Sequence, residues 1–72
     1  MTDAHRYQLR LSAIAANETA TREALDAAWT AVHATTDNAT YHKAMRTVRK
    51  AQAANDAAWA EWREALNSAY SI

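Results

Sequence analysis

The stretch Thr35-Thr36-Asp37-Asn38 is the one clear interruption in a 72-residue chain that otherwise consists largely of helix-forming residues. Threonine, aspartate and asparagine side chains compete for backbone hydrogen bonds, so they favour turns and helix caps over helix interiors. The chain also has 20 alanines and neither glycine nor proline, which leaves few other positions where a helix would stop. The sequence therefore predicts two helices, at about 3–34 and 37–68, joined by this turn.

Large apolar residues recur at helical spacing on both sides of the turn. They are Tyr7, Leu11, Ile14, Leu25 and Val32 in the first segment, and Tyr41, Met45, Val48, Trp59, Trp62 and Leu66 in the second. Each position in the first stripe has a counterpart equally far beyond the turn, for example Ile14 opposite Trp59 and Val32 opposite Tyr41. This symmetry is what an antiparallel pair of helices requires. We predict a single all-α domain over residues 1–72, folded as a two-helix hairpin.

Alanine forms a second stripe, with members seven positions apart in both segments. It comprises Ala13, Ala20, Ala24, Ala27 and Ala31 in the first helix and Ala44, Ala51, Ala58 and Ala65 in the second. Small side chains let another helix approach closely, so we expect this side to pack against a second copy and form a homodimeric four-helix bundle, or against the helices of another protein. Arg6, Arg10 and Asn17 flank the stripe and Trp29 lies at the edge of the apolar stripe, which makes them candidate partner contacts. The simpler interpretation is that alanine is only a good helix former and that Trp29 only packs at an edge.

Two layers in the middle of the predicted seam are polar, with Glu18 opposite Asn55 and Thr21 opposite Gln52. A polar residue in a helical seam penalises slipped pairings, so control of register is one interpretation. A buried carboxylate beside amide groups could also bind a ligand or act as an acid or base. In a third interpretation, Glu18 forms an ordinary surface ion pair with Arg22, one helical turn later.

The second helix carries the one basic run of the chain, made up of Lys43, Arg46, Arg49 and Lys50. Clustered cations attract phosphates, so this run is a candidate nucleic-acid contact. The alternative is a solvated charged face, partly neutralised by ion pairs from Asp26 to Arg49 and from Glu23 to Lys50 across the hairpin.

The composition excludes several kinds of site. Without glycine, the chain has no phosphate-cradling loop and no nucleophile elbow. Without cysteine, it has no disulfide framework and no thiolate metal site. The three histidines lack metal-ligand spacing, and a formal net charge of zero gives no overall attraction to nucleic acid or membranes. We expect no enzymatic activity, no cofactor, no metal and no small-molecule substrate.

The expected function is a non-enzymatic protein–protein interaction module, such as a small regulator, inhibitor or assembly factor. The alternative is a nucleic-acid-binding regulator that uses the basic run. The N-terminal residues lack the pattern of a secretion signal, and no apolar run is long enough to span a bilayer, so we expect a cytoplasmic protein. Six arginines against two lysines, with abundant alanine, favour a GC-rich bacterial or phage genome as the source.

Overall fold

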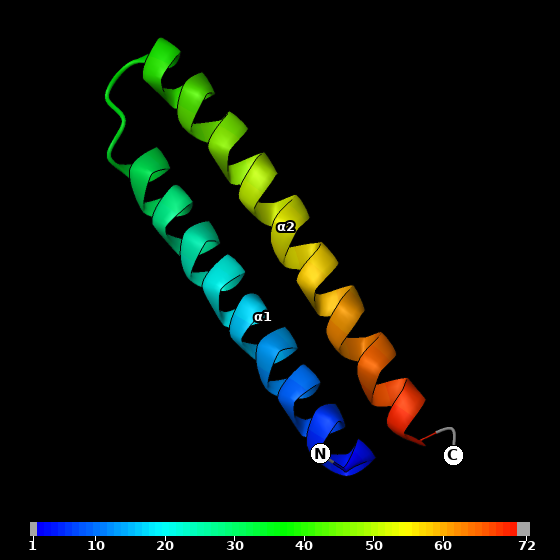
Figure 1. Cartoon of the computed structure of the whole chain (residues 1–72). Helices are drawn as coiled ribbons and strands as arrows, with labels where there is room; N and C mark the ends of the chain where they lie inside the picture. The colour runs from blue at the N-terminus through cyan, green and yellow to red at the C-terminus, as the bar shows by residue number, and fades with distance from the viewer. Residues whose placement is uncertain (1, 71–72) are drawn as a thin grey trace.

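The chain folds into two helices that lie side by side and run antiparallel (Figure 1). This computed structural model describes residues 2–70. Helix α1 spans Asp3–His33 and helix α2 spans Asn38–Tyr70. The molecule is a rod with extents of 55 × 20 × 12 Å, with the connecting turn at one end. The all-α hairpin predicted from the sequence is confirmed, and the helix ends lie within two residues of the expected positions.

The turn forms where the sequence predicts it, because its side chains take over the backbone groups that the helices leave unpaired. The backbone N–H and the hydroxyl of Thr35 donate to the Val32 carbonyl at 3.1 and 2.7 Å, which closes α1. Asp37 caps α2, since its Oδ1 accepts from the backbone N–H of Thr40 at 2.8 Å. The polar stretch therefore ends one helix and starts the next without glycine.

The seam between the helices is built mainly from small side chains. The buried apolar residues are Ile14, Ala28 and Val32 in α1 and Val48, Ala58 and Ala65 in α2. Leu25, Ala44, Met45 and Ala51 pack around the cluster formed by Ala28, Val32 and Val48. The α1 stripe predicted from the sequence is confirmed, because all five of its large residues are buried or half-buried. Near the open end, the Tyr7 hydroxyl donates to the Ala65 carbonyl at 3.2 Å and links the two helices.

The prediction for the α2 side of the seam was partly wrong. Tyr41 and Trp59 are 41% and 42% exposed, and Gln52 is also exposed. In their place the seam contains the alanines at seven-residue spacing, namely Ala44, Ala51, Ala58 and Ala65. Relative to the predicted packing, α2 is thus turned by about 50° about its own axis, which is half of one residue step. Alanine in the seam lets the two backbones approach closely, whereas indole and amide groups of this size fit better at the rim.

This rotation also corrects the predicted partner interface. The four α2 alanines lie against α1 and are therefore not on an open face. Ala58 and Ala65, for example, are only 1% and 3% exposed. The open alanine stripe consists of its α1 members alone.

Ala58→Leu tests this packing, with Ala57→Leu as its matched control. Three additional carbons at a position that is 1% exposed overpack the seam, and we expect a loss of about 1–3 kcal/mol in the free energy of unfolding. Ala57 is the exposed neighbour, so the same substitution there should change stability by less than about 0.5 kcal/mol. Urea unfolding followed by circular dichroism measures both variants. Equal effects at the two positions would contradict the rotated seam.

The Asp37 cap predicts a specific dependence of stability on pH. The hydroxyl and then the backbone N–H of Thr40 hydrogen-bond the carboxylate and hold the pKa of Asp37 below its usual value of 3.8. The unfolded state then binds the proton more readily than the folded state does. The contribution of the Asp37 charge to stability is therefore fully present above pH 3.8, and it is lost as the pH falls through the lower pKa of the folded state. We expect the difference in Tm between wild type and Asp37→Asn to shrink as the pH falls from about 5 to about 2. A difference that stays constant over this range would show that the charge of Asp37 does not stabilise the fold.

Candidate functional site

The alanine row on α1 is open to solvent along the length of the helix. Ala13, Ala20, Ala24, Ala27 and Ala31 are all exposed, and their spacing by three, four and seven residues places them on one side of α1. Arg6, Arg10 and Asn17, the predicted flanking contacts, are exposed as well. This row, without its predicted α2 counterpart, is the surface that a second helix could approach closely.

The exposed aromatic residues lie elsewhere. Trp29 is 40% exposed and stacks on His33 with ring centroids 6.3 Å apart. The rings of Tyr41 and His42 pack edge to face, with their centroids 5.6 Å apart. The helical repeat places Trp29 on the opposite side of α1 from the alanine row. One flat partner surface therefore cannot contact both.

The polar layer exists, although with three members of the four that were predicted. Asn55 is 6% exposed, and its amide donates to the Thr21 hydroxyl at 3.0 Å and to the Glu18 carbonyl at 3.5 Å. The predicted pairing of Glu18 with Asn55 is thus confirmed. Gln52 was placed wrongly, because the rotation of α2 moves it to the surface, where it donates to Asp56 at 2.9 Å within the same helix. The Asn55 contacts span both helices, so a slipped pairing would leave buried polar groups unpaired.

The Glu18 carboxylate is the least satisfied polar group in this layer. Glu18 is 9% exposed, and its Oε1 atom is buried without a hydrogen-bond partner. The other oxygen, Oε2, lies 3.9 Å from the Arg22 guanidinium, whose side chain is 55% exposed. This distance is too long for a hydrogen bond. The ion pair with Arg22 predicted from the sequence is therefore present, but it leaves one buried carboxylate oxygen unpaired.

A small cavity opens beside this carboxylate. It has a volume of about 180 Å³ and is lined by Ala15, Glu18, Thr19, Trp59 and Trp62. Trp59 and Trp62 are one helical turn apart on α2, and Trp59 reaches the surface. Glu18 was predicted from the sequence but this cavity was not, because the apolar stripe placed Trp59 in the seam. The three-residue spacing of Trp59 and Trp62, which places both rings on one side of α2, was the sequence feature that could have indicated this cavity.

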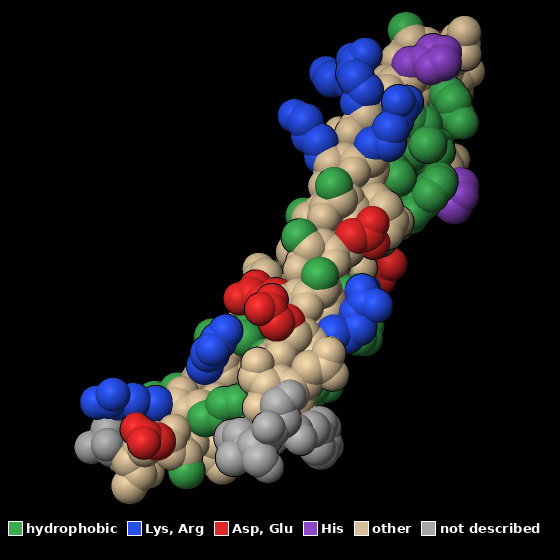
Figure 2. Space-filling view, turned by 90° about the vertical axis from the view of Figure 1, so that its right-hand side faces the viewer, with side chains coloured by type: hydrophobic (Ala, Val, Ile, Leu, Met, Phe, Trp, Pro, Cys, Tyr) green, Lys and Arg blue, Asp and Glu red, His purple; other side chains and the backbone are tan. Residues whose placement is uncertain are grey.

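The basic cluster, Lys43, Arg46, Arg49 and Lys50, is fully exposed on α2 near the turn. Figure 2 shows Lys and Arg side chains gathered at that end of the rod, with the acidic side chains further along it. The predicted cross-helix pairs from Asp26 to Arg49 and from Glu23 to Lys50 do not form. The Arg22–Glu18 pair is the only ion pair among the described residues. None of the four cations is therefore held in an ion pair within the described residues.

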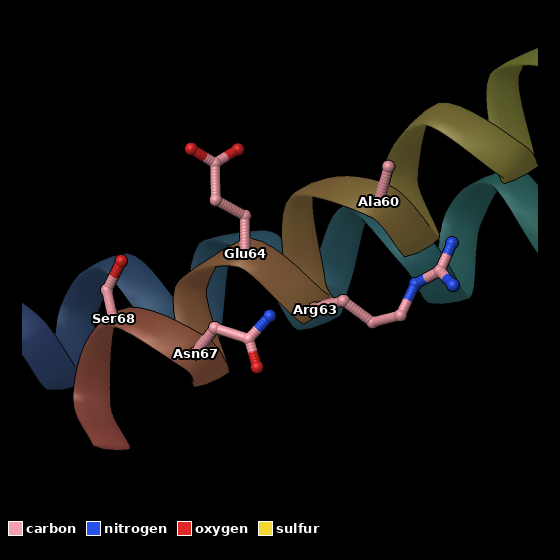
Figure 3. Close-up of a pocket in the computed structure, with 5 residues that line it drawn as sticks. All are labelled: Ala60, Arg63, Glu64, Asn67 and Ser68. Carbon is pink, nitrogen blue, oxygen red and sulfur yellow. The ribbon is translucent and has the colours of Figure 1, made fainter. Parts of the chain in front are cut away.

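A further hollow has a volume of about 640 Å³ and lies near the C-terminal end of α2. Ala60, Arg63, Glu64, Asn67 and Ser68 line it (Figure 3). One helix supplies all of these residues, and Figure 3 shows the Glu64 side chain pointing away from Arg63. A binding pocket needs polar groups that converge on the ligand. The side chains of this hollow do not converge, so we place no site here.

No family model, no curated protein and no solved structure matches this chain. Within residues 2–70, no three histidine or carboxylate side chains are grouped so that they could hold a metal ion. Neither helix has a stretch that is long and apolar enough to cross a membrane, as far as the described residues extend. Three features of the described surface are candidates for function: the α1 alanine row, the basic cluster and the cavity at Glu18.

Proposed function

We propose that this protein is a non-enzymatic interaction module whose α1 alanine row packs against a second copy of the chain. The observation that carries the proposal is the thin core. Only Ile14, Val32 and Val48 are both buried and larger than alanine among the described apolar residues. Cores of this size seldom stabilise a domain of this length without disulfides, metals or oligomerisation. Packing of two hairpins into a four-helix bundle would supply the missing burial.

The dimensions of the rod fit such a dimer. A broad face of 55 by 20 Å offers an area on the order of 1,000 Å² per protomer, and a standard interface needs about 800 Å² per partner. The alanine row covers about 27 Å, roughly half of this length, so two α1 helices related by a twofold axis could approach closely over about five turns. Arg6 and Arg10 continue the row toward the N-terminus of α1 and Asn17 lies within it. They would then provide polar contacts at one end of the interface.

A dimeric bundle of this kind presents helical surfaces to further proteins. We propose that the protein acts as a small regulator, inhibitor or assembly factor, and that it does so through binding and not through catalysis. The convergent groups that a nucleophile, base and oxyanion site require are not brought together in the part of the chain described here.

Ala20→Glu and Ala27→Glu test the dimer. We expect the parent protein to sediment at twice the 8.0 kDa mass of the chain at micromolar concentration. Each variant should shift toward the monomer, because a buried unpaired carboxylate costs several kcal/mol at an interface. Gln8→Glu is the matched control, since it adds the same charge at an exposed position on the opposite side of α1. A parent protein that is a stable monomer would refute the proposal, as would variants that remain dimeric.

One observation favours a second function, which is binding of nucleic acid through the basic cluster. Its four cations lack the acidic partners expected from the sequence, so all four are available to phosphates. The net charge of the chain is zero, and the attraction would therefore be local and strongly screened by salt.

Duplex DNA and RNA of random sequence test this alternative. With four phosphate contacts, affinity should fall on the order of 100-fold between 50 and 200 mM salt. Lys43→Gln combined with Lys50→Gln should weaken binding and reduce the salt dependence. Arg63→Gln is the matched control, because Arg63 is an exposed cation on α2 far from the cluster. An absence of binding at 50 mM salt would rule this function out.

A further inference from the structure

Four exposed rings lie beside the basic cluster at the turn end of the rod. Trp29 stacks on His33, and Tyr41 packs edge to face against His42. All four side chains are exposed. Figure 2 shows hydrophobic side chains between two histidines at this end, next to the group of Lys and Arg side chains. We call these four residues the ring patch.

The two pairs of rings lie on the same side of the hairpin. Trp29 precedes Val32 by three residues, and Tyr41 precedes Ala44 by three residues. Val32 and Ala44 both pack in the seam. A residue three positions earlier is rotated by about 60° around the helix axis. In two antiparallel helices this rotation leads to the same side of the seam, so Trp29 and Tyr41 share one face.

The rings also lie at the level of the basic cluster along the rod. Asn55 donates to the Glu18 carbonyl across the seam, and the antiparallel register runs from this contact toward the turn. It places Trp29 level with residue 44, between Tyr41 and Lys50. The stretch from Tyr41 to Lys50 covers about 14 Å of the rod, so a short ligand can contact the rings and the cations together.

On α2 the rings adjoin the cations directly. His42, Arg46 and Arg49 are spaced by four and three residues, so they lie on one face of α2. No cation of the basic cluster is held in an ion pair within the described residues. A ligand that crosses the hairpin from Trp29 to Arg46 therefore meets aromatic rings first and positive charge next.

We propose that the ring patch and the basic cluster together bind single-stranded nucleic acid. This inference rests on the second function proposed above and narrows its ligand to unpaired strands. Bases stack on Trp29 and Tyr41, and phosphates contact Arg46 and Arg49. Proteins that bind single strands combine a basic surface with aromatic rings in this way, and histidine rings also stack with unpaired bases.

The rings are what distinguish an unpaired strand from a duplex. A duplex carries phosphates at closer spacing, so a surface of cations alone would favour the duplex. The bases of a duplex are stacked on one another and are not free to stack on Trp29 or Tyr41. A preference for single strands therefore reports the rings and not the cations.

Asp26 sets the direction in which the strand lies. It is exposed on α1 one helical turn before Trp29, and its charge repels phosphates. The nearest cations are Arg46 and Arg49 on α2. We therefore place the bases over Trp29 and the phosphates over α2.

The site is independent of the proposed dimer. Trp29 lies on the side of α1 opposite the alanine row, so a second copy packed on that row leaves the ring patch open. Ala20→Glu, which tests the dimer, changes no residue of the patch or the cluster. Failure of the dimer is thus distinguishable from failure of this site.

Oligothymidylate of about 12 nucleotides, within the site sizes usual for single-strand binding, tests the proposal against a duplex of equal length. Fluorescence anisotropy at about 50 mM salt measures both affinities. We expect the single strand to bind at least about fivefold tighter. Equal or weaker binding than that of the duplex would overturn this inference and leave the function of the basic cluster standing. Failure of both to bind would overturn both. Oligouridylate of the same length then shows whether RNA or DNA is preferred.

Trp29→Leu removes one stacking surface and keeps an apolar side chain. It should weaken binding of oligothymidylate by at least about fivefold and leave duplex affinity unchanged. Trp59→Leu is the matched control, because Trp59 has nearly the same exposure but lies about 15 Å beyond Arg49 along α2. Circular dichroism confirms that each variant is folded. Equal losses in the two variants, or no loss in Trp29→Leu, would refute stacking on Trp29.

The indole N–H resonances of the parent protein give a measurement that needs no variant. Titration with oligothymidylate, followed by NMR, should shift the Trp29 resonance with saturation. Trp59 and Trp62 should not shift, since both lie further than Arg49 from the turn. Shifts at Trp59 and Trp62 without one at Trp29 would place the strand elsewhere and overturn the proposal.

Vesicles that contain phosphatidylserine test the other class of partner that basic and aromatic residues bind. His33 and His42 favour nucleic acid, because imidazole rings stack with bases, whereas burial of these polar groups among lipids costs free energy. We expect oligothymidylate to bind and the vesicles not to bind at the same salt concentration. Binding of vesicles without binding of oligothymidylate would overturn the proposal.

Discussion

The close packing of α2 alanines against α1 is the constraint on which the other features of this molecule depend. A hairpin of two long helices has one seam, and the side chains in it set both the distance between the axes and the rotation of each helix. Ala58 and Ala65 lie almost completely inside this seam. Once they do, Trp59 must lie at the rim, Gln52 must lie outside, and the indole of Trp59 comes to rest beside Glu18. The cavity is thus a consequence of alanine packing.

The polar layer shows how the register of so uniform a seam is fixed. Alanine-rich surfaces are nearly smooth, so sliding one helix by a turn would cost little apolar contact. Asn55 changes this, because its amide has partners on α1 in the observed register and would be buried without them in another. Glu18 is different, since its Oε1 gains nothing from the register and remains unpaired. Register control explains Asn55 and Thr21 but does not explain why the Glu18 carboxylate is buried with one oxygen unpaired.

The sequence predicts most of the fold and only part of the candidate site, and the reason lies in α2. The turn residues, the two helices and the α1 stripe follow from local chemistry and from spacing, and the structure confirms them. On α2, however, two adjacent rows were both apolar, one with Trp59 and Leu66 and the other with Ala58 and Ala65. Hydrophobicity favours the row with the larger residues, whereas close packing favours the alanines. This choice depends on the distance between the axes, which a single sequence does not reveal, and the cavity was missed for that reason.

A thin core also determines how binding and folding are related in this chain. A ligand that binds only the folded state stabilises it in proportion to the logarithm of ligand concentration. With few large side chains buried, we expect the intrinsic stability to be small, so a partner on the alanine row would change it by a large fraction. A second copy packed on the alanine row would favour the paired state of the two helices, so association and folding should be coupled.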